Sequence, residues 1–309
     1  MPAHASAGEF SLSIWTSLYW DLSPEDAVRH TADLGWGAID LSCEHFGELW
    51  RSDASRIDAW RTLAEELDIT PWQCHLFMDL NLASASPDER ADMVGRCAEH
   101  LRLASRLGVR NAVVHTGWLR KGVSGPHEQV RANLVASLGG LAPVCAETGV
   151  RLAVENMMAP DFGVPPQDLA DLAEEVGPGQ IGICFDSSHA NASKLPTHEA
   201  VRACGKHLFC LHLSDNDGSG DQHRVPYEGT VDWPGLAAGV REIGYDGPLN
   251  FEIPSLSPRP LAIRDAALAY VQRAMQYAAT GADCCYRRRE ESVREFCRQG
   301  WYDPQFGYE

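Results

Sequence analysis

The sequence predicts a single (β/α)8 barrel, a TIM barrel, with a C-terminal extension. Eight short apolar runs each precede a segment with helical spacing. Strict strand–helix alternation indicates a parallel sheet, and eight units indicate closure into a barrel. An open doubly wound sheet would need a glycine-rich phosphate loop, and the chain contains neither GxGxxG nor GxxxxGK[ST]. We expect the barrel to occupy residues 1–282 and residues 283–309 to form an appendage.

The apolar runs define the predicted strands. In chain order they are Phe10–Thr16, Ala38–Leu41, Thr70–His75, Asn111–His115, Arg151–Glu155, Ile181–Asp186, Leu208–Leu213 and Leu249–Ile253.

Capping signals mark the helices between these runs. Ser23-Pro24, Ser86-Pro87 and Asp232-Trp233-Pro234 each place a capping side chain before a proline in the first turn. Glycines a few residues before a strand predict the helix ends; these are Gly35, Gly108, Gly149, Gly177 and Gly244.

Composition narrows the class of protein. The chain has 309 residues, is 44% hydrophobic and carries a net charge of −17. Such a surface repels a phosphate backbone, so a small-molecule partner is favoured over nucleic acid. Ten cysteines without a CxxC pair indicate reduced thiols in the cytoplasm. The first residues lack a signal-peptide pattern, and no apolar run has the ~18 residues that a membrane span needs.

Polar residues gather at the ends of the predicted strands, where the active sites of such barrels lie. Nine of them are of metal-ligand type, and they are His75, His115, Glu155, Asp186, His189, His212, Asp221, His223 and Glu252.

Four of these residues predict a metal site. Glu155 and Glu252 follow apolar strand residues, where an unpaired carboxylate costs several kcal/mol. A divalent cation shared with Asp186 and His212 would offset that cost. The mostly oxygen ligands suit manganese best, then magnesium or cobalt, and zinc is also compatible.

The strand-end motifs LAVENM, GICFDSSHA, LHLSDN and NFEIPS resemble those of the xylose isomerase-like barrel superfamily, over roughly residues 10–278. That superfamily includes ketose 3-epimerases, inosose isomerases and dehydratases, and the endonuclease IV branch. The resemblance implies that Glu155, Asp186, His212 and Glu252 bind one divalent ion. It also implies that His189 contacts a substrate oxygen and that Glu155 and Glu252 stand on opposite faces of the substrate.

Two segments depart from the sugar-epimerase pattern. The loop DQHRVPYEG places His223, with Arg224 beside it, where those enzymes often carry an arginine. The carboxylate six residues after Glu155 is the shorter Asp161. The same loop resembles endonuclease IV, and His75 and His115 fall where that branch has further zinc ligands. All nine positions of a three-zinc site are therefore filled.

These observations predict a metal-dependent isomerase or epimerase of a ketose or related polyhydroxy carbonyl compound. Glu155 or Glu252 removes a proton next to the carbonyl, and the other returns one after an enediolate has formed. The predicted substrate-binding residues are His189, His223, Arg224, His75, His115, Trp118 and Asp161, and Trp15, Trp118 and Phe77 are expected to form an apolar wall.

Three alternatives remain open. A lyase could dehydrate a keto-sugar or an inosose after the same proton abstraction. An endonuclease IV-like protein would use three zinc ions against a phosphodiester. A barrel subunit could work only within a hetero-complex.

The C-terminal tail is rich in aromatic residues: Phe296, Trp301, Tyr302, Phe306 and Tyr308. We expect residues 283–309 to cover apolar surface on the barrel or on a partner subunit, including a second copy of the chain.

Overall fold

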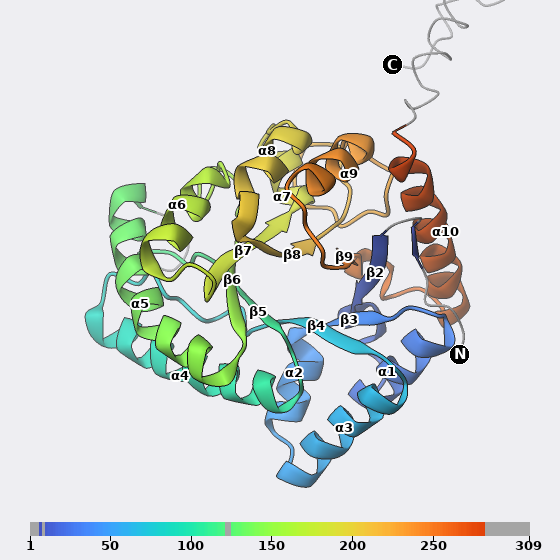
Figure 1. The fold of residues 1–309 in the computed structure, drawn as a ribbon, viewed down its shortest axis with the longest axis horizontal. Helices are drawn as coiled ribbons and strands as arrows, with labels where there is room; N and C mark the ends of the chain where they lie inside the picture. The colour runs from blue at the N-terminus through green and yellow to red at the C-terminus, as the bar shows by residue number, and fades with distance from the viewer. Residues whose placement is uncertain (1–5, 8–9, 121–124, 282–309) are drawn as a thin grey trace, which may run out of the picture.

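A closed ring of eight parallel strands forms the centre of the molecule, with helices around it (Figure 1). The computed structural model describes residues 6–7, 10–120 and 125–281. The barrel strands are β2 (Phe10–Trp15), β3 (Ala38–Leu41), β4 (Thr70–His75), β5 (Asn111–Val114), β6 (Arg151–Glu155), β7 (Ile181–Asp186), β8 (Leu208–His212) and β9 (Leu249–Phe251). The predicted TIM barrel is confirmed, and every predicted strand is present, with C-terminal ends up to two residues shorter.

The ring closes where the last strand meets the first. β9 pairs with β2 in parallel, with Leu249 opposite Leu12. Leu213, just beyond β8, donates its backbone N–H to the Asn250 carbonyl at 2.9 Å and accepts from the Glu252 N–H at 3.0 Å. A short strand, β1 (Ser6–Ala7), adds to β2 in antiparallel orientation.

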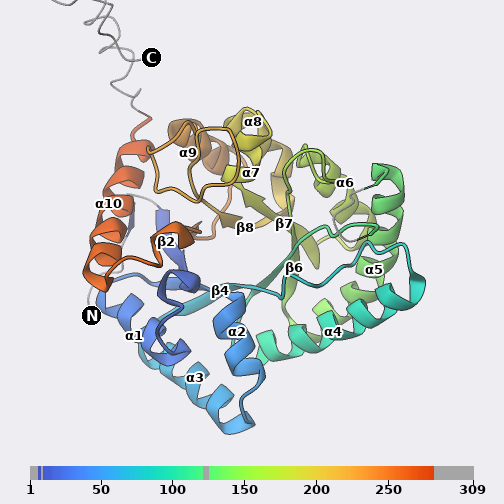
Figure 2. The same ribbon diagram turned by 180° about the vertical axis from the view of Figure 1, so that it is seen from behind.

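Helices surround the ring in both face views (Figures 1 and 2). They are α1 (Pro24–Asp33), α2 (Cys43–Trp50), α3 (Ala54–Glu66), α4 (Pro87–Arg106), α5 (His127–Thr148), α6 (Gln167–Val176), α7 (Ser187–Ala192), α8 (Thr197–Cys204), α9 (Trp233–Glu242) and α10 (Leu261–Ala279).

The predicted helix starts are confirmed. The side chains of Ser23, Ser86 and Asp232 each accept a backbone N–H three residues later. The predicted helix-ending glycine Gly177 is the C-terminal cap of α6.

Side-chain alternation along the strands places the polar residues. Apart from the main hydrophobic core, the strands β5 to β8 form a smaller apolar cluster. It contains the buried residues Val113, Ala153, Cys184 and Cys210. Successive side chains of a strand point to opposite faces, so residues two positions further on share the same face. Those residues are His115, Glu155, Asp186 and His212. The apolar cluster therefore forms the floor beneath a polar layer at the C-terminal end of the barrel.

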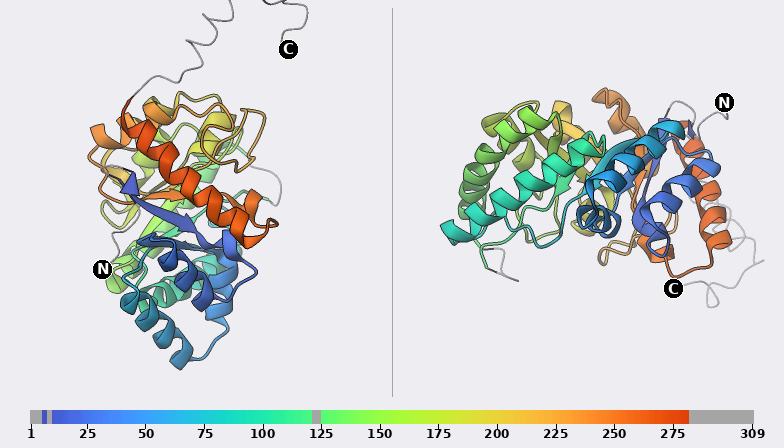
Figure 3. Two further views of the ribbon diagram at one scale, coloured as in Figure 1. Left: turned by 90° about the vertical axis from the view of Figure 1, so that its right-hand side faces the viewer. Right: turned by 90° about the horizontal axis from the view of Figure 1, so that it is seen from below.

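The described chain ends on α10, which lies beside α9 and the first strands (Figure 3). Arg241 of α9 donates to the carbonyl of Ala279 at 2.6 Å. The predicted appendage, residues 283–309, lies outside the described residues. Among the helices that are described, none has the length and apolar character needed to cross a bilayer.

A buried histidine in α4 leads to a first testable prediction. The ring of His100 makes edge-on contacts with Phe46, Trp50 and Phe77, and its Nδ1 finds no hydrogen-bond partner within the described part of the chain. Burial lowers the pKa of His100 from 6.5 to about 4. The unfolded chain therefore takes up a proton there at a higher pH than the folded protein does. The free energy of unfolding should fall as pH drops from 6.5 towards 4.

The variant His100→Phe should reduce this pH dependence, because it keeps the ring contacts and removes the titrating group. Urea unfolding at several pH values measures the effect. The half-buried His198 of α8 is the control, and His198→Gln should keep a steeper slope than His100→Phe. Equal slopes for His100→Phe and the wild type would contradict the assignment.

Candidate metal centre and substrate site

Four side chains from neighbouring strands converge at the C-terminal mouth of the barrel. One ligand atom each of Glu155, Asp186, His212 and Glu252 lies within 4.8 Å of all the others, and all four residues are buried. Nδ1 of His212 is 3.1 Å from Oε1 of Glu155 and 3.2 Å from Oε2 of Glu252. The structure thus brings together the four residues that the sequence predicts as metal ligands.

The spacing and bonding of these atoms fit a divalent cation. Two ligand atoms bound to one ion at 2.0–2.1 Å are roughly 2.8–3.4 Å apart in octahedral or tetrahedral geometry. The separations around His212 fall in this range. Oδ2 of Asp186 is buried and has no hydrogen-bond partner among the residues that the structure describes. A cation would satisfy this oxygen, which is otherwise costly to keep from water.

The electrostatics of the cluster also favour a cation. Burial opposes ionisation of Glu155, but His212, His115 and His75 outweigh it and hold the pKa of Glu155 well below its usual range. Burial raises the pKa of Asp186 to about 7. Three carboxyl groups thus crowd one buried point, where a divalent charge would stabilise their ionised forms.

Two further histidines face the second oxygen of Glu155. Nε2 of His75 lies 3.5 Å from Oε2 of Glu155, and Nε2 of His115 lies 3.4 Å from the same oxygen. Nδ1 of His75 is hydrogen-bonded to the Leu76 carbonyl at 2.7 Å, which directs Nε2 towards Glu155. These two of the predicted substrate-binding histidines therefore border the cluster of four candidate metal ligands.

Asp221 joins the remaining two predicted histidines. Its Oδ2 lies 2.8 Å from Nε2 of His223 and 3.5 Å from Nε2 of His189. Nδ1 of His189 bonds to the Asn156 carbonyl at 2.8 Å, and Nδ1 of His223 to the Glu252 carbonyl at 3.2 Å. Burial lowers the pKa of His223, but Asp221 and Glu252 outweigh it and raise that pKa to about 9. All nine strand-end residues thus form one connected group.

Comparison with known proteins assigns the chain to a family. The model of the xylose isomerase-like TIM barrel family matches residues 28–274. The chain belongs to this family. The resemblance is confirmed, and all four strand-end motifs lie within the matched residues.

Individual relatives share the barrel at low identity. An uncharacterized protein of Methanocaldococcus jannaschii is 28% identical over 182 residues, or 57% of this chain and 61% of that protein. An inosose isomerase of Bacillus licheniformis is 27% identical over 133 residues, or 41% of this chain and 48% of that protein. D-psicose 3-epimerase of Clostridium cellulolyticum H10, solved with D-tagatose, superposes with a TM-score of 0.75 at 17% identity, covering 89% of this chain and 100% of that one.

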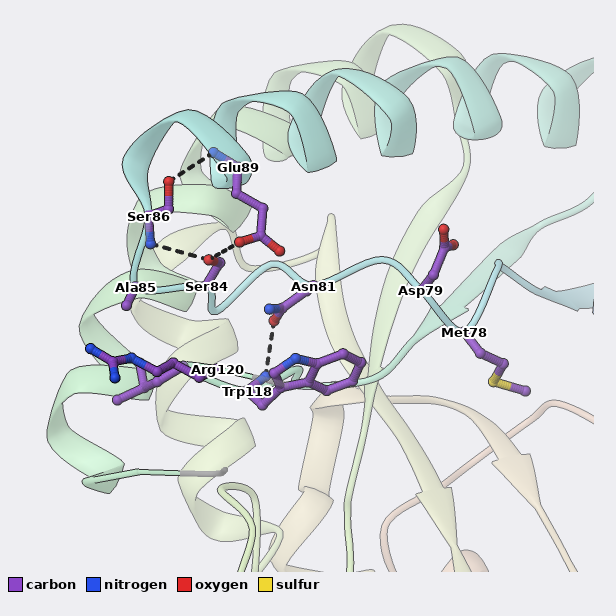
Figure 4. Close-up of a pocket in the computed structure, with 10 residues that line it drawn as sticks. Met78, Asp79, Asn81, Ser84, Ala85, Ser86, Glu89, Trp118 and Arg120 are labelled. Carbon is purple, nitrogen blue, oxygen red and sulfur yellow. Dashed lines mark hydrogen bonds between the residues drawn. The ribbon is translucent and has the colours of Figure 1, made fainter. Parts of the chain in front are cut away.

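This xylose isomerase-like barrel has a pocket of about 870 Å³ on its rim (Figure 4). The loops that follow β4 and β5 line this pocket. β4 ends at His75, and His115 directly follows β5. Trp118, a predicted substrate-binding residue, lines the pocket and donates its backbone N–H to Oδ1 of Asn81 at 2.9 Å. Figure 4 shows Arg120 and Met78 at opposite ends, with the Trp118 indole between them.

Arg224 lies in the loop between β8 and α9, and Asp161 lies in the loop between β6 and α6. The guanidinium of Arg224 donates to Oδ2 of Asp217 and to the Glu228 carbonyl, both at 3.0 Å. These two partners are outside the nine-residue group. Asp161 is half-buried in a turn after β6, where its backbone N–H donates to the Met158 carbonyl. Substrate binding by Arg224 and Asp161 stays a prediction.

The residues expected to form an apolar wall occupy different places. Trp15 is buried at the end of β2, with its ring centroid 6.3 Å from that of His75. Phe77 packs instead against the rings of Phe46 and His100, on the α2 and α4 side of the barrel. Trp15 is thus adjacent to the ligand cluster, whereas Phe77 packs on surrounding helices.

One charged residue of this site was not predicted from the sequence. Asp40 on β3 is fully buried and lies 3.0 Å from Nε2 of His212 through its Oδ2. The sequence signal for Asp40 is an isolated acidic residue in the four-residue run AIDL. Asp40 lies two residues after Ala38, so both side chains point to the same face of β3.

Proposed function

We propose that the protein is a divalent-metal-dependent isomerase or epimerase of a ketose or related polyhydroxy carbonyl compound. The observation that carries the proposal is the convergence of Glu155 and Glu252 on Nδ1 of His212, beside Asp186. Similarity to an inosose isomerase and to D-psicose 3-epimerase supports this class of substrate. Three of the four ligands are carboxylates, so manganese is the proposed ion.

A bound divalent cation would polarise the substrate carbonyl and stabilise the negative charge that develops when the neighbouring carbon loses its proton. Glu155 and Glu252 each have two oxygens, so one can face the cation while the other exchanges a proton. In this proposal one glutamate takes the proton and the other returns one, to the same or the neighbouring carbon. Burial of both residues keeps bulk water from the reacting atoms.

The surrounding histidines would bind substrate oxygens. Burial opposes protonation of His189, but Asp186, Asp221 and Glu155 outweigh it and hold the pKa of His189 well above its usual range. The pKa of His223 is also raised. Charged imidazoles donate stronger hydrogen bonds than neutral ones. Beside His189, His223, His75 and His115, we propose Trp118, Asp161 and Arg224 as contacts of the rest of the substrate.

A substrate panel tests the proposed reaction. Manganese-loaded protein would be incubated with unphosphorylated and phosphorylated ketoses and with inososes, and the products analysed by NMR and mass spectrometry. We expect an isomer with the mass of its substrate. A product lighter by one water would identify a lyase and overturn the isomerase assignment.

A second candidate function rests on the histidine geometry. His75, His189 and His223 each bond a backbone carbonyl through Nδ1 and direct Nε2 at a carboxylate. Metal-bound histidines commonly show this arrangement. Oε2 of Glu155, with Nε2 of His75 and of His115, could hold a second ion, and Asp221 with its two histidines a third. Three ions would suit hydrolysis of a phosphodiester.

Metal analysis separates the two candidate functions. If His75, His115 and His223 bind substrate, purified protein should retain about one tightly held divalent ion per chain. Inductively coupled plasma mass spectrometry after gel filtration measures this number. A value close to three zinc ions, together with cleavage of an abasic-site oligonucleotide, would favour the phosphodiesterase.

A further inference from the structure

We propose that Asp40 is a positioning residue that fixes the ring of His212 so that Nδ1 faces the cation. This inference rests on the metal site of the proposed function, but not on the identity of the substrate. Asp40 belongs to β3 and His212 to β8, so strands far apart in the sequence supply the pair.

The contact sets which nitrogen of His212 faces Asp40. Oδ2 of Asp40 lies 3.0 Å from Nε2 of His212, and both side chains are fully buried. With a cation on Nδ1, Nε2 would be the nitrogen that donates to Asp40. Nδ1, on the other side of the ring, faces Glu155 and Glu252. The ring therefore presents Nδ1 to the point where the carboxylates converge.

A network of amide side chains holds Asp40 in place. Gln73 donates to Oδ2 of Asp40 at 2.8 Å, and Asn250 donates to the same oxygen at 3.1 Å. Gln73 also donates to the Leu211 carbonyl at 3.1 Å, next to His212 in the chain. Ser13 fixes Asn250 by donating to its Oδ1 at 2.7 Å. Side chains from β2, β4 and β9 thus orient the Asp40 carboxylate.

The charge of Asp40 gives this network a role beyond packing. A neutral acceptor would hold the ring, but a carboxylate also makes Nδ1 of His212 a more basic ligand. In the described ranges, Oδ1 of Asp40 has no hydrogen-bond partner, so the carboxyl group is held through Oδ2. Keeping such a charge in the barrel interior is costly unless it is paired. Its ionic partner in the structure is His212.

Metal affinity tests the role. Co²⁺ would be titrated into chelator-treated protein and followed by its visible absorption. Asp40→Asn should raise the Kd by at least about tenfold, within the range found for groups that support metal ligands. Ser13→Ala is the matched control, because it alters the same buried network without touching His212, and its Kd should stay within about threefold. A wild-type Kd for Asp40→Asn, or an equal loss for Ser13→Ala, would overturn the proposal.

A double-variant cycle shows whether Asp40 acts through His212. In a His212→Gln background, Asp40→Asn should change the Kd by less than about threefold. The full tenfold loss in that background would assign Asp40 a role that does not pass through His212.

A measurement on the wild-type protein does not depend on any variant folding. In Zn²⁺-loaded protein labelled with ¹⁵N-histidine, His212 should show a protonated Nε2 and a metal-bound Nδ1. The opposite assignment would overturn the proposal. All three experiments read metal binding rather than turnover, so a protein that binds metal as described but converts no sugar would overturn the proposed function alone.

Discussion

Glu252→Gln is expected to lower kcat by at least three orders of magnitude. The substitution removes a proton-transfer group, worth about 10²–10⁴-fold, and weakens the polarising field of the cation by taking away one charged ligand. Glu155→Gln should have a comparable effect, because an oxygen of Glu155 lies at 3.1 Å from Nδ1 of His212, as an oxygen of Glu252 does at 3.2 Å. Steady-state kinetics with manganese-saturated variants measure both losses.

Glu174→Gln provides the matched control. Glu174 is an exposed residue of α6 that pairs with Lys206, away from the nine-residue group. The same chemical change there should leave kcat within about twofold. If metal-saturated Glu252→Gln and Glu155→Gln both keep near wild-type turnover, the two-glutamate mechanism is wrong, and His189 and His223 become the candidates for acid–base catalysis.

Removal of the cation should have the second largest effect. Chelation is expected to abolish turnover and to lower the thermal unfolding midpoint, because a ligand that binds only the folded state stabilises it by about 2.7 kcal/mol at 100 times its Kd. Adding Mn²⁺ back should restore both. Dialysis against a chelator, followed by calorimetry and an activity assay, tests this expectation.

Asp186→Asn links the chelation result to the predicted site. Asn keeps the shape of Asp186 and removes a buried charge, so the variant should need much more Mn²⁺ for half-maximal activity. Full turnover in the chelated wild-type protein, or an unchanged manganese requirement in Asp186→Asn, would show that the cluster does not act through a metal.

The barrel was largely predictable from the sequence because its signals are local. Apolar runs, capping serines and strict alternation define strands and helices without knowledge of distant contacts. The two helices α2 and α3 between β3 and β4 were not separately predicted, since a short helix carries little periodic signal.

The candidate site was predictable where strand ends determine position. Glu155, Asp186 and His212 end their strands and Glu252 directly follows β9, so one alternation rule brings them together. Asp40 was missed because its importance comes from a cross-barrel contact with His212 that no spacing reveals. Arg224 shows the converse, since the loop sequence does not specify that its guanidinium pairs with Asp217.

Solvent deuterium uptake tests the central claim most directly. Manganese-loaded protein would convert its substrate in D₂O, and ¹H NMR would follow the hydrogens next to the carbonyl. Metal-dependent proton transfer by Glu155 and Glu252 predicts deuterium at the carbon that receives the returned proton, and none after chelation or in the Glu155→Gln/Glu252→Gln double variant. A product formed at the wild-type rate without deuterium at either carbon would contradict proton transfer by these two residues.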